Sequence, residues 1–384
     1  MINIFQKSEY LSQFIQESKR VEFFSKRLKY IFSNIHLYIN KSDFDLKKTS
    51  SIYYFNSIKK ELIYLITTQI NEIESKNLLT HLNKGIDLKF KSLLFDILIK
   101  YGLKDLIFPF FLWIDYYHIN NYKELDINLN FLKSKNLKFT SLDELFNYGR
   151  NNTYFILPYI NPNNNKDNLI KICQFMRHVC SDLNYDNLHK RTIKSKQKTR
   201  IGFYSERLKY DSSVLRDRMG IISNLDRNKF DVFIFVSENE QYYLKNYKGN
   251  FVKPFFNKNK DDFVFLPQSL KESRNIINFL ELDILLFCEL GMDYKPYLLS
   301  FSRLAPIQIN TWGHSETSGI DTIDYYFSSK YFESQLSISQ KYYSEKLILM
   351  DSLSTYYPNL EEYISLKKFK TRKELNFKET DNIY

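Results

Sequence analysis

The densest group of side chains able to do chemistry lies in residues 311–324, Thr-Trp-Gly-His-Ser-Glu-Thr-Ser-Gly-Ile-Asp-Thr-Ile-Asp. This stretch holds one of the six histidines and one of the two tryptophans of the chain, among hydroxyls and carboxylates that bind ligands or carry protons. A lone histidine is usually structural. His314, however, follows a glycine in a polar stretch, and there a functional role is about as common as a structural one. His314 is therefore the first candidate catalytic residue.

Two further polar stretches, residues 205–213 and 288–293, also contain side chains that could bind a ligand or take part in catalysis. The first leads into a predicted helix whose free N–H groups could face an anion, although Ser212 or Ser213 as an ordinary N-cap is the favoured interpretation. In the second, Gly291 permits a sharp turn or the close approach of a ligand. Glu289 and Asp293 are either acid–base groups or, more commonly, solvated turn carboxylates.

Several other kinds of site are excluded by residue type and spacing. The three cysteines form no CxxC pair, which argues against a disulfide framework and against zinc. There is no metal-ligand spacing, no Gly-rich phosphate loop and no nucleophile elbow, so we expect neither a metal nor a bound cofactor. In residues 216–218, Arg-Asp-Arg, an internal ion pair is favoured over a phosphate clamp.

The elements that position these stretches follow an α/β pattern from residue 200 onward. Short apolar runs at 201–204, 230–236, 263–266, 282–287 and 307–310 alternate with helical patterns at 214–225, 269–280 and 294–303. This alternation predicts βαβ units and a Rossmann-like parallel sheet covered on both faces. Ligands of such sheets bind beyond the carboxyl ends of the strands, where residues 205–213, 288–293 and 311–322 fall.

The region before the α/β pattern reads as helical. Residues 10–39, 52–73 and 93–113 place apolar side chains three and four positions apart, which predicts an array of packed helices over residues 1–140 without a convincing 34-residue repeat. Residues 141–195 form a connecting part, with an extended piece at 154–160 and a helix capped by Asp167. A basic run at 190–200 marks the boundary to the lobe of residues 196–384.

Composition narrows the class of protein. With 43% hydrophobic and 26% charged residues, the 384-residue chain has the balance of a soluble globular protein. The formal net charge of +11 comes from scattered lysines, and the basic run is favoured as a solvated linker over a phosphate-binding strip, so nucleic acid remains a weak alternative. The longest uncharged apolar piece, 106–114, is far shorter than the ~20 residues of a membrane span. We expect no membrane association and a cytoplasmic location.

Around His314 the sequence resembles the protein O-GlcNAc transferase family, which includes adhesin-modifying protein glycosyltransferases. Three pieces share the order and spacing of that family's catalytic region: Ser302-Arg-Leu-Ala-Pro-Ile-Gln, Thr311-Trp-Gly-His and Thr317-Ser-Gly-Ile-Asp-Thr-Ile-Asp-Tyr. Arg200-Ile-Gly-Phe-Tyr-Ser, Leu282-Asp-Ile-Leu-Leu and Tyr343-Ser-Glu-Lys-Leu-Ile-Leu-Met resemble its strands. The resemblance covers about residues 196–384, and it is specific as a set.

The resemblance implies the first Rossmann-like lobe of a two-lobed GT-B enzyme, with helical repeats in front that recruit protein substrates. A UDP-sugar, carrying N-acetylglucosamine or a hexose, would be the donor, and Ser/Thr or Asn of a protein or peptide the acceptor. His314 and Asp211 are the implied catalytic residues. The implied substrate-binding residues are Ser212, Gly291, Trp312, Gly313, Thr317, Ser318, Gly319 and Asp321.

Two departures from the family qualify this expectation. Where the family carries a histidine and a small residue after its first strand, this sequence has Asp211 and Ser212. The Gln and Lys that hold the diphosphate in the second lobe have no counterpart here, so we expect a truncated or split enzyme with weak or absent UDP binding. The alternative is a non-catalytic helical and α/β protein that binds polypeptide.

Overall fold

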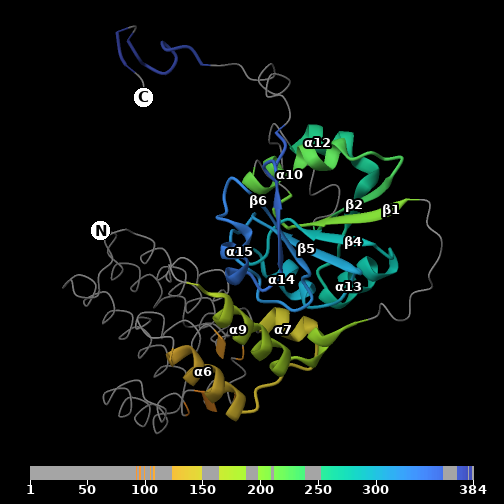
Figure 1. Cartoon of the computed structure of the whole chain (residues 1–384), viewed down its shortest axis with the longest axis vertical. Coiled ribbons are helices and arrows are strands. Elements are labelled where there is room, and N and C mark those ends of the chain that lie inside the picture. The colour runs from red at the N-terminus through yellow and green to blue at the C-terminus, as the bar shows by residue number, and fades with distance from the viewer. Residues whose placement is uncertain are drawn as a thin grey trace, which may run out of the picture. The chain divides into compact units, whose positions relative to one another are not determined.

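A computed structural model of the chain is shown in Figure 1. It describes residues 92, 95–96, 99, 104, 107–108, 123–148, 164–186, 198–208, 212–237, 252–357, 370–378 and 380–382. The helices predicted at 10–39 and 52–73, most of the one at 93–113, and the extended piece at 154–160 lie outside these residues. So do Asp211 and most of the basic run.

The chain divides into two compact units. The first comprises Met1–Leu137 with Glu144–Thr153, and the second comprises Lys138–Asp143 with Tyr154–Tyr384. Within the first unit, α6 (Lys123–Ser134) buries Leu129 and Leu132, three residues apart on one face, as its helical pattern predicts. The next helix, α7 (Leu142–Tyr148), begins in the second unit and continues in the first.

The second unit is built on a seven-stranded sheet in the order β3-β2-β1-β4-β5-β6-β7. Its strands are β1 (Thr199–Tyr204), β2 (Phe230–Val236), β3 (Phe263–Phe265), β4 (Ile284–Phe287), β5 (Ile307–Thr311), β6 (Tyr325–Ser329) and β7 (Lys346–Met350). Every neighbouring pair is parallel. The predicted Rossmann-like α/β lobe is confirmed.

The helices that connect these strands cover both faces of the sheet. Figure 1 shows α10 (Ser213–Asn224) and α12 (Val252–Lys258) on one face, and α13 (Leu270–Phe279) and α14 (Tyr294–Ser300) on the other. The chain moves outward from β1 to β3 and then returns to β4 beside β1, so right-handed crossovers place the two sets of helices on opposite faces. Short helical turns η5 (Ser181–Asn184), η7 (Lys260–Asp262), α15 (Leu336–Ser339) and η8 (Gln340–Tyr342) complete the connections.

A hydrophobic core lies between the sheet and the first pair of helices. Its members come from α10, α12 and the central strands: Val214, Leu215, Met219, Ile222, Phe255, Phe256, Phe203, Val232, Ile234 and Val236. Each such side chain stabilises the fold by about 1.5–3 kcal/mol relative to an exposed one. All three cysteines, Cys173, Cys180 and Cys288, are buried and free.

Several helix boundaries differ from those the sequence predicts. Helix α9 (Lys166–Val179) has Asn165 at its N-cap position, so Asp167 lies in the first turn and is not the cap. Helix α14 ends at Ser300 instead of continuing to residue 303. Beyond the helix, the main-chain N–H of Arg303 donates to the carbonyl of Tyr185, 2.9 Å away.

Candidate functional site

The sheet reverses its strand order between β1 and β4, and the residues that follow these two strands meet. Ser205 follows β1 and Glu289 lies two residues after β4. The Ser205 hydroxyl donates to Glu289 Oε1 at 3.3 Å, and both residues are fully buried. In open parallel sheets this reversal point is where ligands bind, which makes it the centre of the candidate site.

The turn after β5 joins the same place through Gly313. A β-carbon on Gly313 would lie 2.3 Å from the carbonyl oxygen of Cys288 and 2.6 Å from the β-carbon of Glu289. Only glycine allows the two turns to approach this closely. The N–H of Gly313 donates to the carbonyl of Thr311 at 2.9 Å, which tightens the turn. All three polar stretches predicted from the sequence therefore have members at one edge of the sheet.

The surroundings of Glu289 favour the protonated form of its carboxyl. Burial raises the pKa of its carboxyl well above the ordinary value, and the nearby Asp293 raises it further. The carboxyl accepts a hydrogen bond from the N–H of Met292 at 3.0 Å. Gly291 has a φ of 107°, a conformation that favours glycine, and it shapes this turn.

A second polar network borders the centre at the ends of β1 and β2. The hydroxyls of Tyr204 and Ser237 donate to Glu206 Oε1. Lys295, at the start of α14, donates to the Ser237 hydroxyl at 2.6 Å and to the carbonyl of Pro267 at 2.5 Å. Together these contacts fix the positions of charged groups that burial would otherwise destabilise.

Arg207 and Asp293 form an ion pair with a 2.5 Å separation between Nε and Oδ2. Their side chains keep 40% and 28% of their surface exposed, so this pair stands at the solvent-facing rim. The edge of the sheet therefore presents both signs of charge to a ligand.

Trp312 and His314, which flank Gly313, differ in exposure. The Trp312 ring packs against Phe332 with 4.5 Å between ring centroids, and Phe332 is 54% exposed. Trp312 Nε1 is buried and has no hydrogen-bond partner among the described residues. His314 is buried, and its carbonyl accepts a hydrogen bond from the Tyr326 hydroxyl at 3.3 Å. The Trp312–Phe332 pair is the aromatic surface of the site.

Thr317, Ser318 and Gly319 are buried and serve to anchor the loop. The Thr317 hydroxyl donates to Glu345 Oε2 at 2.6 Å, and the Ser318 N–H donates to Glu345 Oε1 at 2.7 Å. Gly319 has a φ of 70°, and a β-carbon there would meet the backbone of Leu169 in α9 at 2.6 Å. A substrate-binding role for these three residues stays a prediction.

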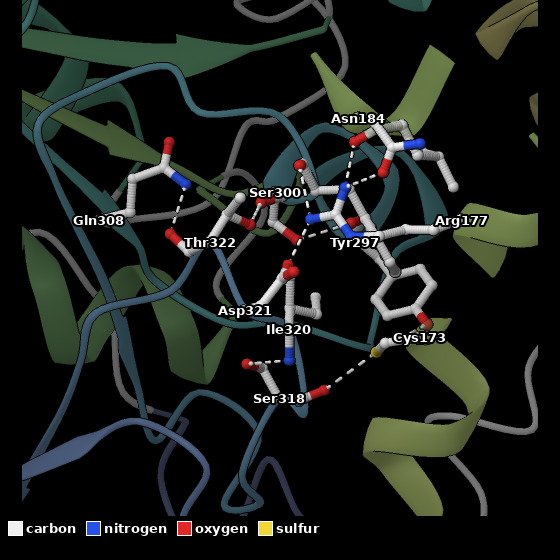
Figure 2. Close-up of polar contacts among 12 residues, drawn as sticks. Cys173, Arg177, Asn184, Tyr297, Ser300, Gln308, Ser318, Ile320, Asp321 and Thr322 are labelled. Carbon is white, nitrogen blue, oxygen red and sulfur yellow. Dashed lines mark hydrogen bonds and ion pairs between the residues drawn. The ribbon is translucent and has the colours of Figure 1, made fainter. Parts of the chain in front are cut away.

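Asp321 lies farther along the loop and pairs with Arg177 of α9. Figure 2 shows this ion pair beside the Thr322 hydroxyl, which donates to the Ser300 carbonyl at the end of α14. Gln308 Nε2 donates to the Thr322 carbonyl at 2.9 Å. Of the site residues predicted in this loop, Trp312 to His314 lie at the sheet edge, and Thr317 to Asp321 fasten the loop to Glu345 and α9.

Ser212 is the N-cap of α10, the interpretation favoured from the sequence. Its hydroxyl accepts a hydrogen bond from the Leu215 N–H at 3.1 Å and donates to the Arg207 carbonyl. Because the cap occupies the hydroxyl, Ser212 ties the turn after β1 to the helix that follows. Its role in substrate binding stays a prediction.

Two buried residues that shape the site were not among the predicted ones. Glu345 lies between Ser344 and Lys346 just before β7, and from these polar neighbours one would predict an exposed residue. In the structure it is buried. The internal ion pair expected in residues 216–218 does not involve Arg218. No carboxylate lies within ion-pair distance of Arg218 in the part of the chain that the structure describes, and its guanidinium instead donates to the Ser354 carbonyl and the Thr311 hydroxyl.

Glu316 should make stability depend on pH. Burial raises the pKa of its carboxyl from 4.5 to about 7, against the opposing hydrogen bonds from the Asn165 side chain and the Thr317 N–H. The folded state thus keeps the proton to a higher pH than the unfolded chain, so this contribution to stability is present below pH 4.5 and is lost as the pH rises to about 7.

The Glu316→Gln variant, which mimics the neutral form, tests this. In urea unfolding series between about pH 4 and pH 8, the variant should gain stability relative to the parent as pH rises, and the gain should level off above about pH 7. A stability difference that stays constant across this range would contradict the assignment.

The described residues contain no group of three or more His, Cys, Asp or Glu placed to hold a metal ion. Among them there is also no helix with the length and apolar character needed to cross a bilayer.

No family model matches the sequence, and no curated protein matches it. Among solved structures, the chain is similar to a mutant of the O-GlcNAc transferase of Thermobaculum terrenum. The two sequences are 12% identical, the alignment covers 88% of this chain and 59% of that one, and the TM-score is 0.42. This chain spans less than two thirds of the length of that protein. The Rossmann-like character of the sheet stands on its own strand pairing.

Proposed function

We propose that this chain forms one lobe of a protein glycosyltransferase that moves a sugar, N-acetylglucosamine or a hexose, from a UDP-sugar to Ser/Thr or Asn of a polypeptide. The ordered run from Ser302 to Tyr325 resembles the catalytic region of the protein O-GlcNAc transferase family. In the reaction, the acceptor oxygen or nitrogen bonds to the anomeric carbon, the bond from that carbon to UDP breaks, and the acceptor loses a proton.

The observation that carries the proposal is the meeting of three turns at the reversal point of the sheet. Ser205, Glu289 and Gly313 come from separate parts of the chain, and direct contacts join them there. Such an edge is the usual ligand site of an open parallel sheet. It offers an aromatic surface at Trp312 and Phe332, and a mixed-charge rim at Arg207 and Asp293.

In this proposal the edge of the lobe holds the acceptor polypeptide, and His314 contacts the acceptor or the sugar. The donor is expected to be held mainly by a second lobe, as the family resemblance implies. Trp312 would pack against an apolar part of the acceptor or of the sugar. No metal enters this scheme.

A non-catalytic polypeptide-binding protein is the second candidate. Ser205 and Glu289 are fully buried, so neither side chain can touch a substrate in this conformation. A surface that binds polypeptide at Trp312 and Phe332 without sugar transfer would have the same exposed features.

Replacing His314 with alanine should reduce sugar transfer at least about tenfold, because an acid–base or binding group at the reacting centre contributes that much or more. Because the second lobe is expected to hold the donor, the assay uses the enzyme completed by that lobe. It is incubated with UDP-N-acetylglucosamine or UDP-glucose and a peptide library, and modified peptides are counted by mass spectrometry. His178→Ala is the matched control, because His178 is an exposed histidine on α9. The control should transfer like the parent and keep its thermal unfolding midpoint. His314→Ala removes a buried side chain and should lower the midpoint, so transfer is compared at a temperature at which both variants are folded.

The outcomes separate the candidates. Transfer that is unchanged in His314→Ala removes this residue from the site. Peptide binding that protects the amides of residues 311–316, with no transfer from either donor, favours the non-catalytic protein. Absence of both binding and transfer contradicts the proposed function.

A further inference from the structure

Arg218 is a buried guanidinium whose position the proposed reaction does not explain. The side chain lies in the second turn of α10 and is 3% exposed. Burial lowers its pKa, and its Nε has no hydrogen-bond partner among the residues that the structure describes. A charge placed in such surroundings is destabilising unless its hydrogen bonds are well placed, so the groups it contacts are informative.

One of these groups belongs to Ser354–Tyr357, which we name the exit segment because it follows β7. Arg218 donates to the carbonyl of Ser354. The Tyr357 hydroxyl donates to Asp217 Oδ1 at 2.6 Å. Gly220 lies directly against the segment, since a β-carbon there would be 1.9 Å from the Tyr356 carbonyl oxygen. Contacts at Ser354, Tyr356 and Tyr357 therefore place the exit segment against α10.

The other group is the end of β5, where the site begins. Arg218 donates to the Thr311 hydroxyl at 3.2 Å, and that hydroxyl donates to the carbonyl of Phe327 in β6 at 3.0 Å. Thr311 also accepts the hydrogen bond from Gly313 that closes the turn. A shift of Thr311 would therefore move the turn that places Gly313 against Glu289.

We propose that Arg218 is a positioning residue that couples the exit segment to the turn of residues 311–314. When the exit segment is held on α10, Arg218 bridges it to Thr311 and fixes the turn. When the segment leaves α10, the guanidinium loses one of its two acceptors and the turn loses its support. The relevance of this coupling to sugar transfer rests on the proposed function, whereas the coupling itself does not.

The coupling is tested by dislodging the exit segment without touching the turn. Gly220→Ala places a methyl group into the Tyr356 carbonyl, so the segment must move. Amide hydrogen exchange, followed by mass spectrometry, is measured for residues 311–314 and 354–357. Loss of a hydrogen bond from a charged donor should speed exchange about tenfold in both segments.

Two more variants distinguish an effect transmitted through Arg218 from a general increase in amide exchange across the lobe. In an Arg218→Met background, Gly220→Ala should still free residues 354–357, but it should no longer change exchange at 311–314. Ser213→Ala, at an exposed position of the same helix, should leave both segments unchanged. If Gly220→Ala does not fold, Tyr357→Phe replaces it, because it removes only the hydrogen bond to Asp217.

The proposal is overturned if the exit segment is freed and exchange at 311–314 stays as in the parent. It is also overturned if the effect on 311–314 persists undiminished without Arg218. Because no sugar or acceptor is used, these results are independent of the transfer assay. Absence of transfer would count against the proposed function alone.

Discussion

The Gly313→Ala variant should lose about 3 kcal/mol of unfolding free energy, the upper part of the range for overpacking. The added methyl group would stand 2.3 Å from the Cys288 carbonyl oxygen and 2.6 Å from the β-carbon of Glu289, so the backbone has to move. The turns after β4 and β5 would separate, and the candidate site would lose its centre. Urea unfolding followed by circular dichroism measures the effect.

Ser315→Ala is the matched control for this variant. Ser315 is exposed and lies two residues farther along the same loop, so its replacement should change the unfolding free energy by less than about 0.5 kcal/mol. If Gly313→Ala were as mild as the control, the close contact between the two turns would be wrong, and with it the main support for the proposed site.

The Glu345→Ala variant should lose a similar amount, about 3 kcal/mol, through a different cause. The buried carboxyl accepts hydrogen bonds from the Thr317 hydroxyl, the Ser318 N–H and the Ser344 hydroxyl, at 2.6, 2.7 and 3.1 Å. Removing it leaves the buried Ser318 N–H without an acceptor, while the Thr317 and Ser344 hydroxyls keep only each other, 2.9 Å apart. The loop of residues 317–319 would then detach, and the effect is measured by chemical unfolding.

Glu345→Gln distinguishes lost hydrogen bonds from lost packing. The amide keeps the size of the side chain and one acceptor oxygen, so the loss should be about half that of the alanine variant. Equal losses in both variants would mean that the charge itself matters most. A loss below about 1 kcal/mol in Glu345→Ala would contradict the anchoring role.

The sheet was largely predictable from local sequence. Strand β2 spans Phe230–Val236, as predicted, because a run of bulky apolar residues stands between polar turns. The parallel pairing of the strands agrees with the predicted βαβ units. Gly291 was also predictable as a turn residue, since few other residues adopt its positive φ.

The sequence did not predict that residues 312–314 lie at the sheet edge while residues 317–321 fasten the loop to other elements. Residues 317–321 have the hydroxyls and carboxylate of a binding loop, but their partners lie far away in the chain. Glu345 is 28 positions from Thr317, and Arg177 is 144 positions from Asp321. The role of Arg218 depends on Ser354, 136 positions away. Such pairings are decided by tertiary packing, which no local spacing encodes.

The adjacency of β1 and β4 also has a kinetic consequence. The N–H of Arg200 in β1 donates to Asp283, which directly precedes β4 and lies 83 positions farther along the chain. Closing so long a loop is entropically costly and slow compared with forming a neighbouring βαβ unit. We therefore expect Ser205 and Glu289 to come together only after β1 and β4 pair, which is later than the formation of a neighbouring βαβ unit. The candidate site would then form after the local units of the sheet.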